Sequence, residues 1–250
     1  MKHLLLFTCF LLVCVMMVSC SKKSGEEENA MNKLTEQEIE EGWTLLFDGE
    51  TTNGWRGYNK ESFPEQGWEV VDGTLHCIGS GRGEAGSGGD IITEKRFKNF
   101  ELKLEWKIAE GGNSGIFYLA QEKPGEPIWH NAPEMQVLDN ERHMDANLGK
   151  NGNRQAGALY DLIPAEPQTT KPAGEWNQVK IYCEKGLVVH YMNGEKILEY
   201  HLWTPDFKKL IGESKFNEYS DFAEYDEGHI GLQDHGDDVW YRNIKIRELE

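Results

Sequence analysis

The 250-residue sequence is short of positive charge, of cysteine and of long apolar runs. Lysine and arginine number 26 against 43 aspartates and glutamates, a formal net charge of −17, which argues against nucleic-acid binding through a general basic field. No apolar run reaches the roughly 18 residues of a membrane-spanning helix. The hydrophobic content of 38% and the 27 glycines are instead typical of a folded, loop-rich globular protein.

The first twenty residues have the pattern of a targeting segment. A basic start, Met1-Lys2-His3, precedes an uncharged apolar run from Leu4 to Val18, and Ser19 stands directly before Cys20. This pattern resembles a bacterial lipoprotein signal, and a buried helix is the alternative. The resemblance implies that residues 1–19 are removed and that Cys20 is lipidated. It also implies a Gram-negative-type cell envelope, on the outer membrane or a periplasmic face, with membrane contact through the lipid anchor only.

Only two of the five cysteines, Cys77 and Cys183, would then remain in the folded domain. Two cysteines so far apart do not have the spacing of a metal site. An oxidising periplasm would allow them to pair, but we favour two buried thiols.

The rest of the chain predicts a short helix followed by one all-β domain. Residues 20–41 are expected to hold the lipidated cysteine, a flexible linker and a helix that begins at the Thr35/Glu38 capping box and ends at Gly42. Residues 42–250 show no composition break and no repeat, and their short alternating segments and turn signals predict an antiparallel β-sandwich. The expected strands are 68–71, 74–78, 100–108, 116–119, 134–138, 179–183, 187–192, 196–200, 229–233 and 239–247.

The segment from Glu134 to Asp139 carries the clearest chemical signal. On a strand, Glu134 and Gln136 share one face and Met135 and Val137 the other, and a bulge near Leu138 would bring Asp139 to the polar face. Retaining glycosidases hold two carboxyl groups about 5–5.5 Å apart, as such a row does. However, laminarinase-type glucanases have the motif E-x-D-x-x-E, and here the middle acid is a glutamine. A solvated strand face is the alternative.

His235 is the next candidate. It follows a predicted strand and is flanked by Asp234 and two glycines, so it is either a general base, a metal ligand held by a carboxylate, or a satisfied structural histidine. Among the tryptophans, we expect Trp176 in the core together with Trp68 and Trp106, and Trp129 as a platform for a sugar ring.

Many short motifs, in order along the chain, resemble the 3-keto-disaccharide hydrolase family, also described as the 3-keto-glucoside 1,2-lyase / 3-keto-2-hydroxyglucal hydratase domain. The resemblance spans about Gly42 to Leu249 and implies a concanavalin A-like lectin/glucanase jelly roll of two antiparallel sheets. The motifs are Leu46-Phe47-Asp48-Gly49, Gly88-Gly89-Asp90-Ile91-Ile92-Thr93, Gly112-Asn113-Ser114-Gly115-Ile116-Phe117, Glu134-Met135-Gln136-Val137-Leu138-Asp139, Gly157-Ala158-Leu159-Tyr160-Asp161 and Gly231-Leu232-Gln233-Asp234-His235-Gly236.

The resemblance also implies a reaction that needs no second glutamate. In a 3-keto sugar the C2 proton is acidic, so a base can remove it and the enolate can expel the glycosidic oxygen from C1; water then adds to the glucal. The substrate would be an oxidised disaccharide or glucoside, and a divalent metal ion at its oxygens stays open. The competing classes are a non-catalytic carbohydrate-binding lipoprotein and a laminarinase-like glucanase. We hypothesise that Glu134, Asp139 and His235 form the catalytic centre, and are the metal ligands if an ion is bound. The expected substrate-binding residues are Asn113, Trp129, Gln136, Tyr160 and Gln233.

Overall fold

The computed structural model describes residues 30–81 and 86–250. The predicted signal peptide (1–19), the lipidation site Cys20 and the start of the linker therefore lie outside the described residues. Within the described part, no helix is both long enough and apolar enough to cross a membrane.

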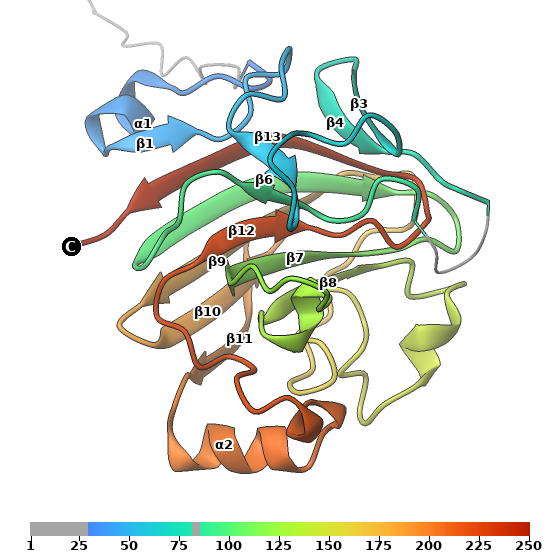
Figure 1. The fold of residues 1–250 in the computed structure, drawn as a ribbon, viewed down its shortest axis with the longest axis vertical. Coiled ribbons are helices and arrows are strands. Elements are labelled where there is room, and N and C mark those ends of the chain that lie inside the picture. The colour runs from blue at the N-terminus through green and yellow to red at the C-terminus, as the bar shows by residue number, and fades with distance from the viewer. Residues whose placement is uncertain (1–29, 82–85) are drawn as a thin grey trace, which may run out of the picture.

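Two antiparallel sheets form the protein, which confirms the predicted sandwich (Figure 1). The larger sheet has the strand order β11-β10-β9-β6-β13-β4-β3. The strand β1 pairs with residues 245–247 of β13, beyond the part of β13 that pairs with β4. The smaller sheet has the order β2-β5-β12-β7-β8. The strands of the larger sheet are β1 (Trp43–Leu45), β3 (Trp68–Val71), β4 (Thr74–Cys77), β6 (Phe100–Ile108), β9 (Asn177–Glu184), β10 (Leu187–Met192), β11 (Glu195–His201) and β13 (Val239–Glu248). Those of the smaller sheet are β2 (Trp55–Gly57), β5 (Ile91–Thr93), β7 (Asn113–Ala120), β8 (Glu134–Leu138) and β12 (His229–Leu232).

The core lies between the two sheets, where each strand turns every second side chain inward. In β6 the predicted alternation holds: Leu102, Leu104 and Trp106 are buried in the core, while Lys103 and its outward neighbours face away from it. The hairpin predicted at Asp72-Gly73 is also present. Trp176 was wrongly assigned to the core: it is half-buried, with the guanidinium of Arg242 3.9 Å from its ring centre.

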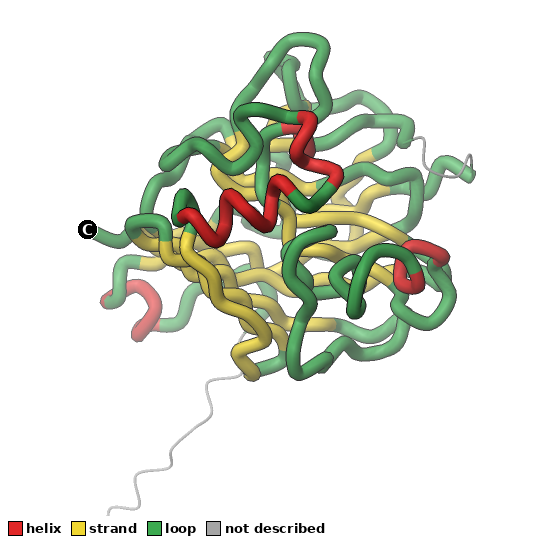
Figure 2. Tube along the Cα trace, turned by 90° about the horizontal axis from the view of Figure 1, so that it is seen from below, coloured by secondary structure: helices red, strands yellow, loops and turns green. Residues whose placement is uncertain are grey.

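The helices are few and peripheral (Figure 2). The predicted capping box is present at the start of α1 (Glu36–Glu40), which lies with β1 at the opposite end of the molecule from α2 (Pro205–Gly212) in Figure 1. Neither α2 nor the three short 3-10 helices was expected from the sequence, because each is too short to show a helical period. The latter are η1 (Ile128–His130), η2 (Met144–Asn147) and η3 (Lys215–Glu218).

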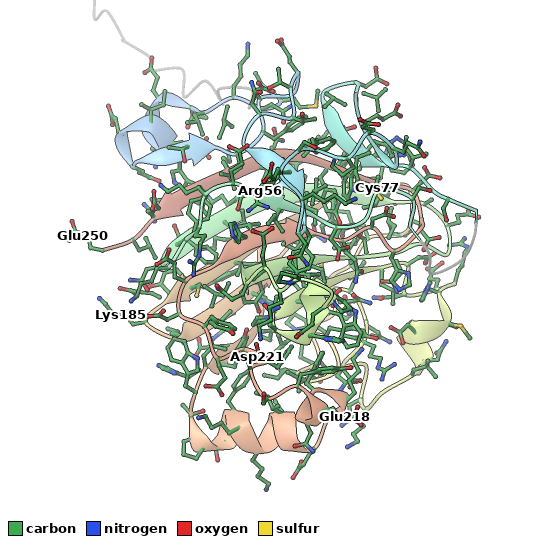
Figure 3. All side chains as sticks on the ribbon, viewed as in Figure 1. Arg56, Cys77, Lys185, Glu218, Asp221 and Glu250 are labelled. Carbon is green, nitrogen blue, oxygen red and sulfur yellow. The ribbon has the colours of Figure 1, made fainter. Side chains whose placement is uncertain are left out.

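Cys77 and Cys183 are both buried free thiols, as predicted. Burial raises the pKa of each thiol, that of Cys183 to about 12, so neither is a reactive thiolate at neutral pH. Cys77, in β4, and Glu218, in η3 on the other side of the sandwich, are both labelled in Figure 3.

Candidate active site

The outer face of the smaller sheet carries the predicted polar residues. In β8, Met135 and Val137 point into the core, so Glu134 and Gln136 point outward, as the alternation predicted. The register sets Gln136 opposite Gly115 of β7. The backbone N–H of Gln233, which lies just beyond β12, donates to the Gly115 carbonyl (3.0 Å). Residues from three neighbouring strands therefore meet on this face.

Glu134 occupies the space that Gly115 leaves open. A Cβ atom at position 115 would lie 2.0 Å from Oε1 of Glu134, so only glycine fits there. The Glu134 side chain is almost fully buried, and burial raises its pKa to about 8 against the opposing charge of Lys215. The carboxyl group therefore holds a proton at neutral pH.

A line of polar side chains runs from Glu134 across the face. In the orientation of the Gln136 side-chain amide that satisfies its neighbours, the nitrogen donates to Glu134 Oε1 and to the Ser114 carbonyl, both at 3.1 Å. In this orientation the Gln136 side-chain oxygen faces the Asn113 amide at 3.2 Å, and the other end of the Asn113 amide lies 3.3 Å from Nε2 of His235. The structure thus connects four of the predicted site residues through contacts between side chains.

His235 belongs to a second group with His143 and Asp237. One ligand-type atom from each of the three lies within 4.8 Å of those of the others, and the two imidazole rings are 6.1 Å apart. Two imidazoles and a carboxylate suit a divalent transition metal. However, Nδ1 of His143 accepts the N–H of Asp145 (3.1 Å), so in the neutral ring the hydrogen is on Nε2 and leaves no lone pair there for a metal.

Asp139 lies beyond the end of β8, and its carboxylate is bound within the adjoining turns. It accepts the N–H groups of Gly111 (2.7 Å) and Glu141 (3.0 Å) and pairs with Arg142 (3.3 Å). Burial alone would raise the pKa of Asp139, but these donors outweigh it and the pKa is lowered. This carboxylate therefore stabilises the adjoining turns.

Tyr160 lies in a charged cluster beside Glu134. Its hydroxyl donates to Asp145 (2.8 Å), and Arg154 pairs with both Asp145 (2.9 Å) and Asp161 (2.5 Å). Burial and the bond to Asp145 raise the pKa of the phenol. Its hydroxyl is therefore held by Asp145, and the guanidinium of Arg154 lies 5.5 Å from the centre of its ring.

Lys215 is a charged residue at the site that was not expected from the sequence. Its ammonium group lies 4.3 Å from the ring centre of Tyr160 and 5.1 Å from that of Trp129, the predicted platform. Burial lowers the Lys215 pKa, and the charge of Glu134 opposes this most strongly among its neighbours. No local pattern marks Lys215, because it reaches the site from η3, far along the chain from β8.

Two further acceptors lie beside the Glu134 line. Among the described residues, nothing donates to the buried Oε1 of Gln233, which leaves an acceptor available for a ligand. Asp90, which directly precedes β5, accepts the N–H of Asp234 (3.0 Å), and burial raises its pKa to about 7. Asp90 was not expected to be a site residue; its place in Gly88-Gly89-Asp90 was the only signal.

The chain belongs to the 3-keto-alpha-glucoside-1,2-lyase-like domain family, whose model matches residues 42–247. It is 48% identical over 275 residues to the 3-keto-disaccharide hydrolase of Bacteroides thetaiotaomicron (strain ATCC 29148), covering 94% of each chain. The family resemblance seen in the sequence is therefore confirmed, and the chain is an enzyme that acts on glycosidic substrates.

Solved structures agree with this fold. A candidate glycosyl hydrolase from Parabacteroides distasonis ATCC 8503 superimposes with a TM-score of 0.78 at 32% identity, covering 88% of this chain and all of that one. A second from the same organism gives a TM-score of 0.65 at 30% identity and covers 83% of this chain and 99% of its own. The jelly-roll class expected from the sequence is therefore confirmed.

Proposed function

We propose that this protein hydrolyses 3-keto-disaccharides by elimination followed by hydration. The relative from Bacteroides thetaiotaomicron bears the name of this hydrolase, which supports the substrate class. The single observation that supports the mechanism is the state of Glu134: one buried acid, protonated near neutral pH, whose outward neighbour on β8 is an amide rather than a second carboxylate.

The alternative mechanism of a retaining glycosidase needs two carboxyl groups that face the scissile bond. Here position 136 is an amide, and the Asp139 carboxylate is held by two backbone N–H groups and Arg142. Glu134 therefore has no partner in the row that could serve as the second catalytic carboxylate.

The proposed elimination is balanced without an oxidant. His235 takes the proton from C2, and the electron pair of the C2–H bond forms the enolate with the 3-keto group. The enolate collapses, the C1–C2 double bond forms, and the C1–O bond breaks as Glu134 gives its proton to the leaving oxygen. Water then adds its oxygen to C1 and its proton to C2, which yields the 3-keto sugar.

The other polar groups have positioning roles in this proposal. Lys215 supplies positive charge for the oxygen on which the enolate forms, and Gln233 Oε1 accepts a sugar hydroxyl. Asn113 and Gln136 hold His235 and Glu134 at fixed orientations, and Trp129 lines the site through its contact with Lys215.

Among the described residues, the group that could hold a divalent metal ion is His143, His235 and Asp237, and the ion would supply positive charge to the substrate oxygens; His143 would then have to give up its hydrogen bond from Asp145. We assign the proton-accepting role to His235 without an ion, because His143 offers Nδ1 to a backbone N–H. Activity that is lost on chelation and restored by one divalent metal would instead make His235 a ligand.

The deciding assay mixes the protein with a 3-keto-disaccharide and, separately, with its unoxidised parent, with and without a chelator. We expect 3-keto-glucose, with transient 2-hydroxy-3-keto-glucal, from the oxidised substrate only. Cleavage of the parent sugar alone would support a glucanase instead. Glycan binding without turnover, in which Glu134→Ala lowers only affinity, would support a carbohydrate-binding protein.

We also propose that the mature chain is anchored in the cell envelope through lipidated Cys20, with residues 1–19 removed. The support is the apolar run that ends at Ser19-Cys20. In cells fed a labelled fatty acid, the full-length precursor should acquire label and sediment with membranes, and Cys20→Ala should lose both. Equal labelling of the variant would refute the lipidation.

A further inference from the structure

The outer face of the larger sheet, on the side of the sandwich away from Glu134, carries three lysines directly opposite one another. The register pairs Lys180 of β9 with Lys103 of β6, and Lys103 with Lys245 of β13. Like charges directly opposite in a sheet are destabilising. In a chain with a net charge of −17, a row of three lysines needs a physical explanation.

The two rows on either side show how this face handles charge elsewhere. On one side Glu105 lies opposite Arg242 and bonds to it (2.7 Å), and on the other side Glu101 bonds to Arg247. Each flanking row therefore pairs a carboxylate with a guanidinium. The central row alone places cation beside cation.

Lys103, in the middle of the row, is the least compensated. Lys180 and Lys245 each have a carboxylate nearby, Glu101 at 3.6 Å and Glu38 at 2.5 Å. Within residues 30–81 and 86–250, Lys103 forms no ion pair, and its ammonium group contacts the ring of Trp43 (4.2 Å). Burial lowers the pKa of Lys103; the charges of Glu38 and Glu101 oppose this effect, and those of Lys245 and Lys180 add to it.

The row lies in a groove of about 740 Å³, within the size range of small-molecule sites. The residues before α1 form one wall, and this wall is fixed: Asn32 exchanges two backbone-to-side-chain hydrogen bonds with Asn243 of β13 (2.6 and 2.8 Å). Asn32 also donates to the Gly73 carbonyl (2.8 Å). Lys33, Arg242 and Tyr191 line the groove as well, and so do the two carboxylates Glu38 and Glu105, each of which pairs with a cation of this face.

We propose that this lysine row is an anion site that binds the phosphate or sulfate group of a larger molecule. The ammonium group of Lys103, which has no ion pair among the described residues, offers its N–H donors to the oxygens of a tetrahedral anion, and the charge of the anion offsets the repulsion within the row. The groove has room for the molecule that carries the group. A free anion and an anionic lipid headgroup share this chemistry, and the test below separates them.

The test uses the full chain and two variants of β6. Lys103→Met removes the central charge, and Lys107→Met is the matched control: Lys107 lies on the same strand and face, also contacts a tryptophan ring (Trp240, 4.5 Å), but does not line the groove. Binding of inorganic phosphate and of sulfate is measured by calorimetry at fixed ionic strength. Sedimentation is measured with phosphatidylcholine vesicles, with and without phosphatidylglycerol.

We expect wild type and Lys107→Met to bind a probe equally, and Lys103→Met to bind it about tenfold or more weakly. Binding of the inorganic anions alone indicates a soluble ligand, whereas sedimentation only with phosphatidylglycerol indicates a lipid headgroup. The proposal is overturned if wild type binds no probe or if Lys103→Met binds as wild type does. Cleavage of the 3-keto-disaccharide should be unchanged in both variants, so this outcome is independent of the proposed reaction.

Discussion

The two outer faces of the sandwich treat charge in opposite ways. On the larger sheet, most charges are paired across neighbouring strands, as Glu105 is with Arg242, in partly solvated positions. On the smaller sheet, Glu134 is buried at 5% exposure and burial raises its pKa; no cation forms an ion pair with it among the described residues. Exposed ion pairs on a sheet contribute little to the free energy of unfolding. A buried carboxyl group lowers the free energy of unfolding, and its raised pKa favours the protonated form at neutral pH. This difference supports our proposal that the reaction takes place on the outer face of the smaller sheet.

The largest expected effect is on activity. Glu134→Gln keeps the shape of the side chain but removes the proton donor, so kcat should fall by about 10²- to 10⁴-fold. The matched control is Glu105→Gln, an outward-facing glutamate on the other sheet, which should change kcat by less than about twofold. A Glu134→Gln variant with near wild-type turnover would contradict the proposed reaction.

The same substitution should stabilise the fold at high pH. Burial raises the pKa of Glu134 to about 8, from 4.5 in the unfolded chain, so between these values the unfolded state releases a proton that the folded state keeps. Wild-type stability therefore falls as pH rises through this window. Glu134→Gln should be more stable than wild type by about 2–4 kcal/mol at pH 8, with the gap closing toward pH 4.5. Urea unfolding across this range measures it, and a gap that does not change with pH would show that Glu134 titrates normally.

Gly115→Ala tests whether the Glu134 side chain needs the space that Gly115 of β7 leaves open. Its Cβ would stand 2.0 Å from Glu134 Oε1, so the carboxyl group must move, and we expect a loss of about 1–3 kcal/mol together with reduced kcat. Gly212→Ala is the control, because its Cβ would meet only one atom, at 3.8 Å. Thermal unfolding and kinetics on both variants give the result; equal behaviour would mean that Glu134 has room to relax.

The smallest expected effect concerns Lys215. Lys215→Met keeps much of the contact with Trp129 and Tyr160 but removes the charge, so kcat should fall about tenfold with a smaller change in KM. Because the Lys215 charge lowers the Glu134 pKa, the high-pH limb of the rate profile should also move upward. Lys208→Met, on the exposed face of α2, is the control. A change in KM alone would make Lys215 a residue that only binds substrate.

Much of the fold was predictable because strand signals are local. The alternation of β6, the exact bounds of β8 and the opposite faces of Glu134 and Met135 follow from a period of two residues. The prediction for Trp176 was wrong because local signals do not report distant contacts. Nothing in its sequence context shows that it contacts Arg242 on an outer face. The helix α2 carries no comparable periodic signal, since its eight residues span only a little more than two turns.

The sequence by itself determined the sheet-forming pattern, the polar face of β8 and, through its many ordered motifs, the family. Only the tertiary structure decided which polar residues meet. It brought Lys215 and Asp90 to the neighbourhood of Glu134, set His143 beside His235, and turned Asp139 into the turns near Gly111. The physical reason is that the period of a strand sets only the direction of a side chain, whereas burial and charge depend on chain segments that arrive from elsewhere. The raised pKa of Glu134 is a property of those segments.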